Sequence, residues 1–156
     1  MSRRILIIAA IFLAVTFRAP LTAQTDPFLG VWEINPARSA LTRGTMARSE
    51  IIAMVAEPGG VKSILVTVSA ERGNAEVHHF IFDGKPHATE GSDQREMSAQ
   101  RTNPRRIDAK IIRNGKETAT RSFEVSEDGK TLTVIGNGTT GSGTPYANDT
   151  RVYEKK

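Results

Sequence analysis

The sequence predicts an all-β domain of about nine short antiparallel strands, folded as a barrel or a sandwich. Three observations support this fold class. Segments rich in Val and Ile with period-two alternation recur about every ten residues, turn signals separate nearly all of them, and no long amphipathic helix is visible. Because links of hairpin length join successive strands, we expect strands that follow one another in the chain to pair.

The turn signals locate the expected strands. Asn114-Gly115 is the strongest two-residue hairpin signal, and Pro-Gly-Gly at 58–60 marks another turn. Longer loops are expected at 83–93 and 137–145. The strands between these signals are expected at residues 30–35, 48–57, 61–71, 75–84, 95–102, 105–113, 116–125, 130–136 and 146–155.

A short helix is expected directly after the first strand. Asn35 is a good N-cap, Pro36 suits the first helical position, and Gly44 suits the stop. The sequence indicates no other helix within the folded domain.

The first 23 residues have the pattern of a secretory signal peptide. Two arginines precede an almost unbroken apolar run at 5–17, and small residues lead to Ala23. The run is shorter than the roughly 20 residues of a membrane-spanning helix, so we expect cleavage after Ala23 and no stable membrane anchor afterwards. The expected organisation is a signal peptide at 1–23 and one β-domain at 24–156, exported to the periplasm or the extracellular space.

Removal of this leader makes the domain almost neutral. The chain has 21 Lys and Arg against 17 Asp and Glu, and the leader takes three arginines with it, which leaves 18 against 17. A near-neutral domain without a basic run among aromatic residues gives no support for nucleic-acid binding. Since the chain has no Cys, packing rather than disulfide bonds must stabilise the exported domain.

No catalytic motif, cofactor motif or metal site is recognisable, so we do not expect an enzyme. The chain has no thiol nucleophile and no Gly-x-Ser-x-Gly, and the Gly-rich stretch at 136–143 lacks the Lys and helix of a phosphate loop. His78 and His79 are adjacent on a strand, so they point to opposite faces and cannot readily share an ion. His87 could join one of them, and the acidic loop at 90–96 lacks calcium-loop spacing.

The alternation of strand faces puts an arginine among apolar side chains. Arg121 shares a face with Ala119, Phe123 and Val125. An inward arginine is costly unless something pairs with it, so Arg121 should meet a carboxylate of the protein or of a ligand. On the strand expected at 75–84, His78 shares a face with Phe80 and Phe82. On the strand expected at 61–71, Ile64, Val66 and Val68 share one face, and Ser63, Leu65 and Thr67 share the other.

Short motifs at the two ends of the domain carry a family resemblance. "FLGVWEI" at 28–34 is similar to the Gly-x-Trp opening of the calycins, which include lipocalins and intracellular fatty-acid-binding proteins. "TRVYEK" at 150–155 resembles the last strand of the fatty-acid-binding branch, with its Arg-x-Tyr. The domain as a whole also resembles uncharacterised exported bacterial proteins with a "DPFxGxWxxNxAxS" opening, a mid-chain "DGK" and a final "YEK".

The calycin resemblance implies a single antiparallel up-and-down β-barrel of about 8–10 strands with one short helix after the first strand. Such a barrel pairs its last strand with its first, so Gly30 and Trp32 would form a structural seam with the last strand. In lipocalins an arginine packs across the Trp ring; in fatty-acid-binding proteins the Arg and Tyr hold a ligand carboxylate. Both roles stay open for Arg151 and Tyr153, which share a face.

We therefore expect an exported lipocalin-like protein that binds a small apolar or amphipathic ligand, which could carry a carboxylate, inside the barrel. The alternative is a solid barrel that acts through its surface as an envelope or extracellular protein-interaction or inhibitor module. No cofactor is expected, and the oligomeric state stays open. The expected polar anchors are Arg121, Arg151 and Tyr153, and the expected wall includes Phe80, Phe82 and Phe123.

Overall fold

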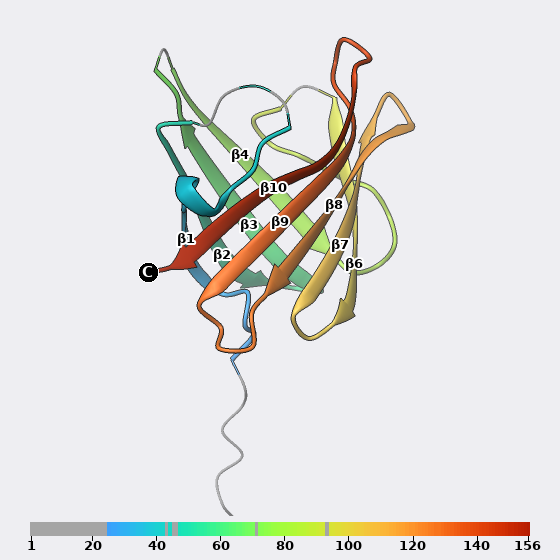
Figure 1. Cartoon of the computed structure of the whole chain (residues 1–156). Coiled ribbons are helices and arrows are strands. Elements are labelled where there is room, and N and C mark those ends of the chain that lie inside the picture. Colours follow the sequence, from blue (N-terminus) through green and yellow to red (C-terminus); the bar gives the residue numbers. More distant parts are fainter. Residues whose placement is uncertain (1–24, 43, 45–46, 71, 93) are drawn as a thin grey trace, which may run out of the picture.

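The computed structural model of the chain describes residues 25–42, 44, 47–70, 72–92 and 94–156 (Figure 1). The expected signal peptide lies outside these residues and stays a prediction. Ten strands form one antiparallel sheet that curves into a nearly closed barrel, which confirms the all-β, up-and-down architecture. The strands are β1 (Gly30–Ile34), β2 (Ser49–Glu57), β3 (Gly60–Val68), β4 (Gly73–Ile81), β5 (His87–Ala88), β6 (Arg95–Asn103), β7 (Arg106–Arg113), β8 (Lys116–Val125), β9 (Thr131–Thr139) and β10 (Pro145–Lys155).

The first and last strands pair, as a closed barrel requires. β1 lies between β2 and β10, with Trp32 opposite Lys155 and Ile34 opposite Tyr153. Gly30 begins β1 with a φ of +129°, and a Cβ at this position would lie 2.9 Å from Cε of Lys155. A residue without a side chain therefore suits both the backbone conformation and the crowding at this seam.

The barrel is open between β4 and β5–β6, which are the two ends of the sheet. One isolated bridge crosses this gap, where Val77 and Glu90 exchange two backbone hydrogen bonds of 3.0 Å. Gly91 allows the close approach, because a Cβ there would lie 2.2 Å from the carbonyl oxygen of Ala75. Closure at the gap therefore depends on few backbone hydrogen bonds.

Apolar side chains fill the end of the barrel that carries the β2–β3, β6–β7 and β8–β9 hairpins, the lower end in Figure 1. Trp32 is fully buried, and its Nε1 donates a 2.8 Å hydrogen bond to the carbonyl oxygen of Phe28. The rings of Phe80 and Phe123 pack with centroids 5.0 Å apart. The other buried side chains of this end include Met54, Val61, Ile107, Val125 and Leu132.

The expected helix after β1 is only a three-residue 3-10 turn, Pro36–Arg38 (η1). Asn35 caps it as predicted, since its side-chain oxygen accepts a 3.2 Å hydrogen bond from the Arg38 amide. The chain then becomes extended, because Ala40 and Thr150 exchange backbone hydrogen bonds of 2.9 and 2.8 Å. Because the chain pairs with β10 before a second helical turn can form, the helix ends well before Gly44, where the sequence predicted its end.

Both expected loops contain more strand than the sequence indicated. β5 lies within the loop expected at 83–93 and pairs with β6. β9 and β10 extend into the loop expected at 137–145 and leave a turn at 140–144. The hairpin signal is correct, since Asn114 and Gly115 have φ values of +50° and +72°, as a two-residue turn between β7 and β8 requires.

Candidate functional site

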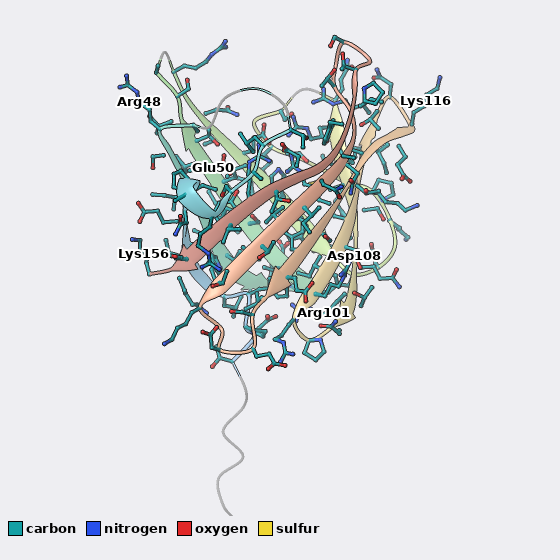
Figure 2. The ribbon with its side chains drawn as sticks, viewed as in Figure 1. Arg48, Glu50, Arg101, Asp108, Lys116 and Lys156 are labelled. Atoms are coloured by element: carbon teal, nitrogen blue, oxygen red, sulfur yellow. The ribbon has the colours of Figure 1, made fainter. Side chains whose placement is uncertain are left out.

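A cavity of about 230 Å³ lies inside the barrel, above the apolar end. Inward positions are apolar near the lower hairpins but largely charged nearer the upper end. Figure 2 shows Glu50 in the upper half of the barrel and Arg101 at the lower end. The polar lining residues are Glu50, Ser63, Thr67, Glu76, His78, Arg95, Arg121, Arg151 and Tyr153, and the apolar ones are Ile52, Leu65, Phe123 and Val134.

Side chains from β2 and β10 form one charged cluster at this cavity. The Tyr153 hydroxyl donates a short hydrogen bond to Oε1 of Glu50, and Nε of Arg151 lies 3.6 Å from the same oxygen. Nη1 of Arg151 also donates a 3.0 Å hydrogen bond to Oδ2 of the buried Asp149. Burial, together with the negative charge of Glu50, raises the pKa of Tyr153 well above its usual range, so the hydroxyl stays protonated and donates.

Glu76 links β4 to β6 in a second cluster. Its Oε2 accepts a 2.5 Å hydrogen bond from Nη1 of Arg95 and lies 3.3 Å from Nε2 of His78. Burial raises the pKa of Glu76, but the hydrogen bond with His78 and the charge of Arg95 outweigh it, so the net pKa is lowered. Burial is also the largest influence on His78 and lowers its pKa, which keeps the imidazole neutral at neutral pH.

Arg121 borders the same cavity from β8, on the face where the strand pattern put it. Within the described part of the chain, no hydrogen bond or ion pair joins its guanidinium to a carboxylate. Burial lowers the pKa of Arg121, and the charges of Arg151 and Arg95 lower it further. Because arginine keeps its proton at physiological pH, an unpaired positive charge faces the cavity.

A smaller recess of about 100 Å³ adjoins the cavity towards the upper end of the barrel. Arg95 and Arg121 border both spaces, and the recess adds Arg113 and Tyr146. Figure 2 shows that Lys116 also lies at this end. Positive side chains along an opening attract anions, so the upper end favours the approach of a negatively charged ligand.

A larger recess of about 660 Å³ lies along the outer surface of β6, β7 and β8. Its lining includes outward-facing polar side chains, among them Asp108, Lys110 and Thr120. The smaller inner cavity is the better candidate site, because charged side chains converge on it from opposite sides of the barrel.

Four of the six ligand-binding residues expected from the sequence meet at the inner cavity: Arg121, Arg151, Tyr153 and Phe123. Phe80 is fully buried in the apolar end beneath it. Phe82 lies elsewhere, with its ring centroid 5.1 Å from the guanidinium carbon of Arg101.

Of the two roles left open for Arg151, packing on the Trp32 ring and facing the cavity, the geometry fits the second. Nζ of Lys155, not Arg151, lies over the Trp32 ring, 4.9 Å from its centroid. This cation–π contact belongs to the seam that contains Gly30. Arg151 instead faces the cavity, where Glu50 and Asp149 already engage it.

The carboxylates of the site were not singled out from the sequence, although the alternation along strands contained a signal. Glu50 shares a strand face with the buried Ile52 and Met54, and Glu76 shares one with His78. A charged residue that keeps the parity of buried neighbours is a candidate for the barrel interior. The partners of Glu50 and Glu76 could not be predicted from the sequence, because most of them lie on strands distant in the chain.

The outer surface of β1, β2 and β3 carries several exposed apolar side chains. The large hydrophobic side chains most exposed there are Val31, Ile51, Val55, Val66 and Val68, each between 37% and 43% exposed. The strand register places Ile51 opposite Val66 and Ser49 opposite Val68, so several of them are neighbours on one face. Adjacent exposed apolar side chains are typical of surfaces that contact other molecules.

His78 and His79 point to opposite sides of β4, as predicted. His78 is buried at the cavity, whereas Nδ1 and Nε2 of His79 lie 2.8 Å from Glu57 and 3.2 Å from Glu90.

Over the described ranges, no group of three or more His, Cys, Asp or Glu side chains could hold a metal ion. No helix found in these ranges has the length and apolar character needed to cross a membrane.

Comparisons with known proteins add no assignment to this site. No family model matches the chain, and no curated protein is significantly similar to it. The candidate site therefore rests on the geometry and charge of the cavity.

Proposed function

We propose that the barrel binds a small amphipathic organic anion in the inner cavity, with Arg121 as the partner of its negative charge. One observation carries this proposal: Arg121 borders a partly open cavity inside the barrel and has no carboxylate partner among the described residues. Arg121 is partly buried, and a partly buried charge without a partner is unfavourable. A ligand carboxylate would supply two oxygens that fit the guanidinium fork.

The size of the cavity restricts the ligand. Its 230 Å³ lies below the roughly 300–1,000 Å³ of sites for drug-sized ligands and equals on the order of eight waters. A cavity of about 150 Å³ is known to accept benzene. The proposal therefore favours a one-ring or short-chain acid over a long-chain lipid.

The lining supports an amphipathic ligand rather than an inorganic ion. Phe123, Val134 and Ile52 offer an apolar wall, and Ser63 and Thr67 lie on another strand of the lining. An anion with an apolar body could place its charge at Arg121 and bury its body against this wall.

Export of residues 24–156 and a relationship to the calycins belong to the same proposal. Support for export comes from the leader pattern in the sequence. Support for the relationship comes from Gly30, Trp32, Arg151 and Tyr153, together with the pairing of the first and last strands.

Binding without catalysis is the activity we propose. Ser63 and His78 face each other across β3 and β4 at the cavity, but among the described residues no hydrogen bond joins the Ser63 hydroxyl to the imidazole, whose Nε2 lies 3.3 Å from Glu76 instead.

Calorimetric titration with benzoate and benzyl alcohol tests the proposal, because these two probes have similar shape but differ in charge. We expect benzoate to bind at least about tenfold more tightly, since hydrogen bonds to charged groups contribute about 1.5–3 kcal/mol. Arg121→Gln should remove that preference. Arg105→Gln is the matched control, because Arg105 pairs with Glu127 at the exposed lower end. Equal affinity for both probes, or benzoate binding that survives Arg121→Gln, would refute the proposal.

The apolar outer face favours a second candidate function, that of a protein-interaction module. Ile51 and Val66, which face each other across β2 and β3, would lie at the centre of the contact. Sedimentation of the wild-type chain and of Val66→Glu measures association through this face. Concentration-dependent association that the substitution abolishes would support this candidate.

A further inference from the structure

We infer that Glu50 occupies, from within the protein, a second anion site formed by Arg151 and Tyr153, and thereby limits the cavity to ligands with one negative charge. This inference rests on the proposed function. It assigns to Glu50 the role of a specificity-determining residue and to the ligand the class of small monocarboxylates.

The contacts of Glu50 are those that a bound carboxylate would make. Tyr153 donates its hydroxyl hydrogen to Oε1 of Glu50, and Nε of Arg151 lies 3.6 Å from that oxygen. Glu50 is 7% exposed and Tyr153 is 2% exposed, so the contact is shielded from solvent. A guanidinium and a hydroxyl that converge on one oxygen form a strong site for an anion.

The chain brings these partners together over a long distance in sequence. Glu50 and Tyr153 are 103 residues apart, on β2 and β10. Arg151 and Tyr153 are two residues apart on β10, so their side chains share the inward face. In the sheet, β1 lies between β10 and β2. Glu50 therefore reaches this site because the barrel curves, and its carboxylate ends at the cavity that Arg121 borders from β8.

The charges around the cavity explain the proposed limit. Arg95 pairs with Glu76, whereas Arg151 has two carboxylates, Glu50 and Asp149. The Arg151 cluster is thus negative by one charge, and Arg121 alone is positive. A first ligand carboxylate can pair with Arg121, but a second would meet Glu50 instead of a free cation.

Loss of the Glu50 charge should change the class of ligand. Glu50→Gln keeps nearly the same shape but leaves Arg151 with one carboxylate, so the cavity gains one positive charge. Glu50→Ala removes both the charge and the side chain that covers Arg151 and Tyr153. Both substitutions should favour dicarboxylates over monocarboxylates, and the alanine variant should do so more strongly.

Calorimetric titrations with benzoate, phthalate, isophthalate and terephthalate test this inference. We expect wild-type protein to prefer benzoate, and both Glu50 variants to raise the affinity for at least one dicarboxylate, relative to benzoate, by tenfold or more. Arg151→Gln in the Glu50→Gln background should cancel the gain. Glu57→Gln is the matched control, because Glu57 is an ion-paired carboxylate at the other end of β2, away from the cavity.

Failure of this inference is distinct from failure of the proposed function. If wild-type protein binds benzoate through Arg121 but the dicarboxylate-to-benzoate ratio is unchanged in both folded Glu50 variants, the inference is wrong and the proposed function stands. If wild-type protein does not bind benzoate while the Glu50 variants bind a dicarboxylate through Arg151, the proposed function is wrong, and of the inference only the second anion site formed by Arg151 and Tyr153 stands. Absence of binding in every variant contradicts both. Circular dichroism and thermal unfolding establish that each variant is folded.

Discussion

The guanidinium of Arg121 lies inside the barrel near Arg151 and Arg95, and its burial and their charges all lower its pKa. Each of the other two has a carboxylate within ion-pairing distance, Glu76 for Arg95 and Asp149 for Arg151. The three arginines should therefore respond differently to removal of their charge. An unpaired inward charge opposes folding, whereas a paired one neutralises a buried carboxylate.

Arg121→Met and Arg95→Met should change stability in opposite directions. We expect Arg121→Met to raise the free energy of unfolding by up to about 1 kcal/mol, because a partly buried charge is lost and no carboxylate loses its ion-pair partner. Arg95→Met should lower it by about 3–5 kcal/mol, because Glu76 remains buried without its cation. Urea unfolding measures both values, and a similar loss in both variants would contradict the unpaired state of Arg121.

The two adjacent histidines should titrate on opposite sides of their ordinary pKa of about 6.5. The hydrogen bond to Glu57 is the main cause that raises the pKa of His79, and Glu90 adds to it. Burial lowers the pKa of His78 against the opposing effect of Glu76, with Arg121 and Arg95 lowering it further. NMR titration of the two imidazole rings measures both, and a higher value for His78 would contradict the placement of β4.

The stability effects of these histidines follow with opposite signs. The stabilisation from His79 is fully present below its unfolded pKa and is lost as pH rises through its raised folded value. His78 stays neutral when folded, so its contribution falls as pH decreases below the unfolded pKa towards the lowered folded value. Thermal unfolding of His78→Gln and His79→Gln between pH 5 and pH 8 separates the two effects.

Strand parity shows how far single residues could be assigned from the sequence. The shared face of Arg121 and Phe123 was readable, and so was the opposite orientation of His78 and His79. The ion pairs were not readable, because Glu50 and Arg151 belong to strands at opposite ends of the chain. β3 was ambiguous, since aliphatic residues occur on both of its faces, and the structure exposes Val66 while Leu65 faces the cavity.

At the scale of elements, the two places where the barrel closes differ in character. β1 and β10 form a regular ladder, whereas one bridge between Val77 and Glu90 joins β4 to the chain before β6. Buried polar atoms without a hydrogen-bond partner occur around this second place in the described structure: Glu57 Oε1, Thr89 Oγ1 and Arg95 Nε. Unsatisfied polar atoms and a short ladder both favour local opening.

Hydrogen exchange should therefore distinguish the gap from the seam. We expect the amides of Val77 and Glu90 to exchange roughly 100-fold faster than that of Asn35, which donates a 2.7 Å hydrogen bond to Val152 at the seam. Arg95→Gln should accelerate exchange at the gap further, because it weakens the pair with Glu76. Equal protection at the two places would show that the gap is no weaker than the seam.

The remaining elements show why boundaries were harder to predict than element types. The Asn114-Gly115 turn was correct, because its positive φ values require these residue types. The helix at 36–43 was too long in the prediction, since local capping signals say nothing of the pairing between Ala40 and Thr150. β5 was missed because two residues have no visible periodicity.

At the scale of the whole molecule, one barrel combines an apolar end and a charged end. The lower end is filled around Trp32 and Phe80, which stabilises the fold without disulfide bonds. The upper end contains the cavity and its arginines. The all-β meander could be predicted from strand spacing, but the division into two ends depends on which residues closure brings together.

NMR titration of the Arg121 Nε–H resonance with benzoate tests the central claim most directly, because it reports contact at the proposed anchor. We predict that this resonance shifts in a saturable way with benzoate and not with benzyl alcohol, while that of Arg105 at the lower end does not move. A resonance of Arg121 that stays unchanged while benzoate binds elsewhere, or that responds equally to benzyl alcohol, would contradict the account.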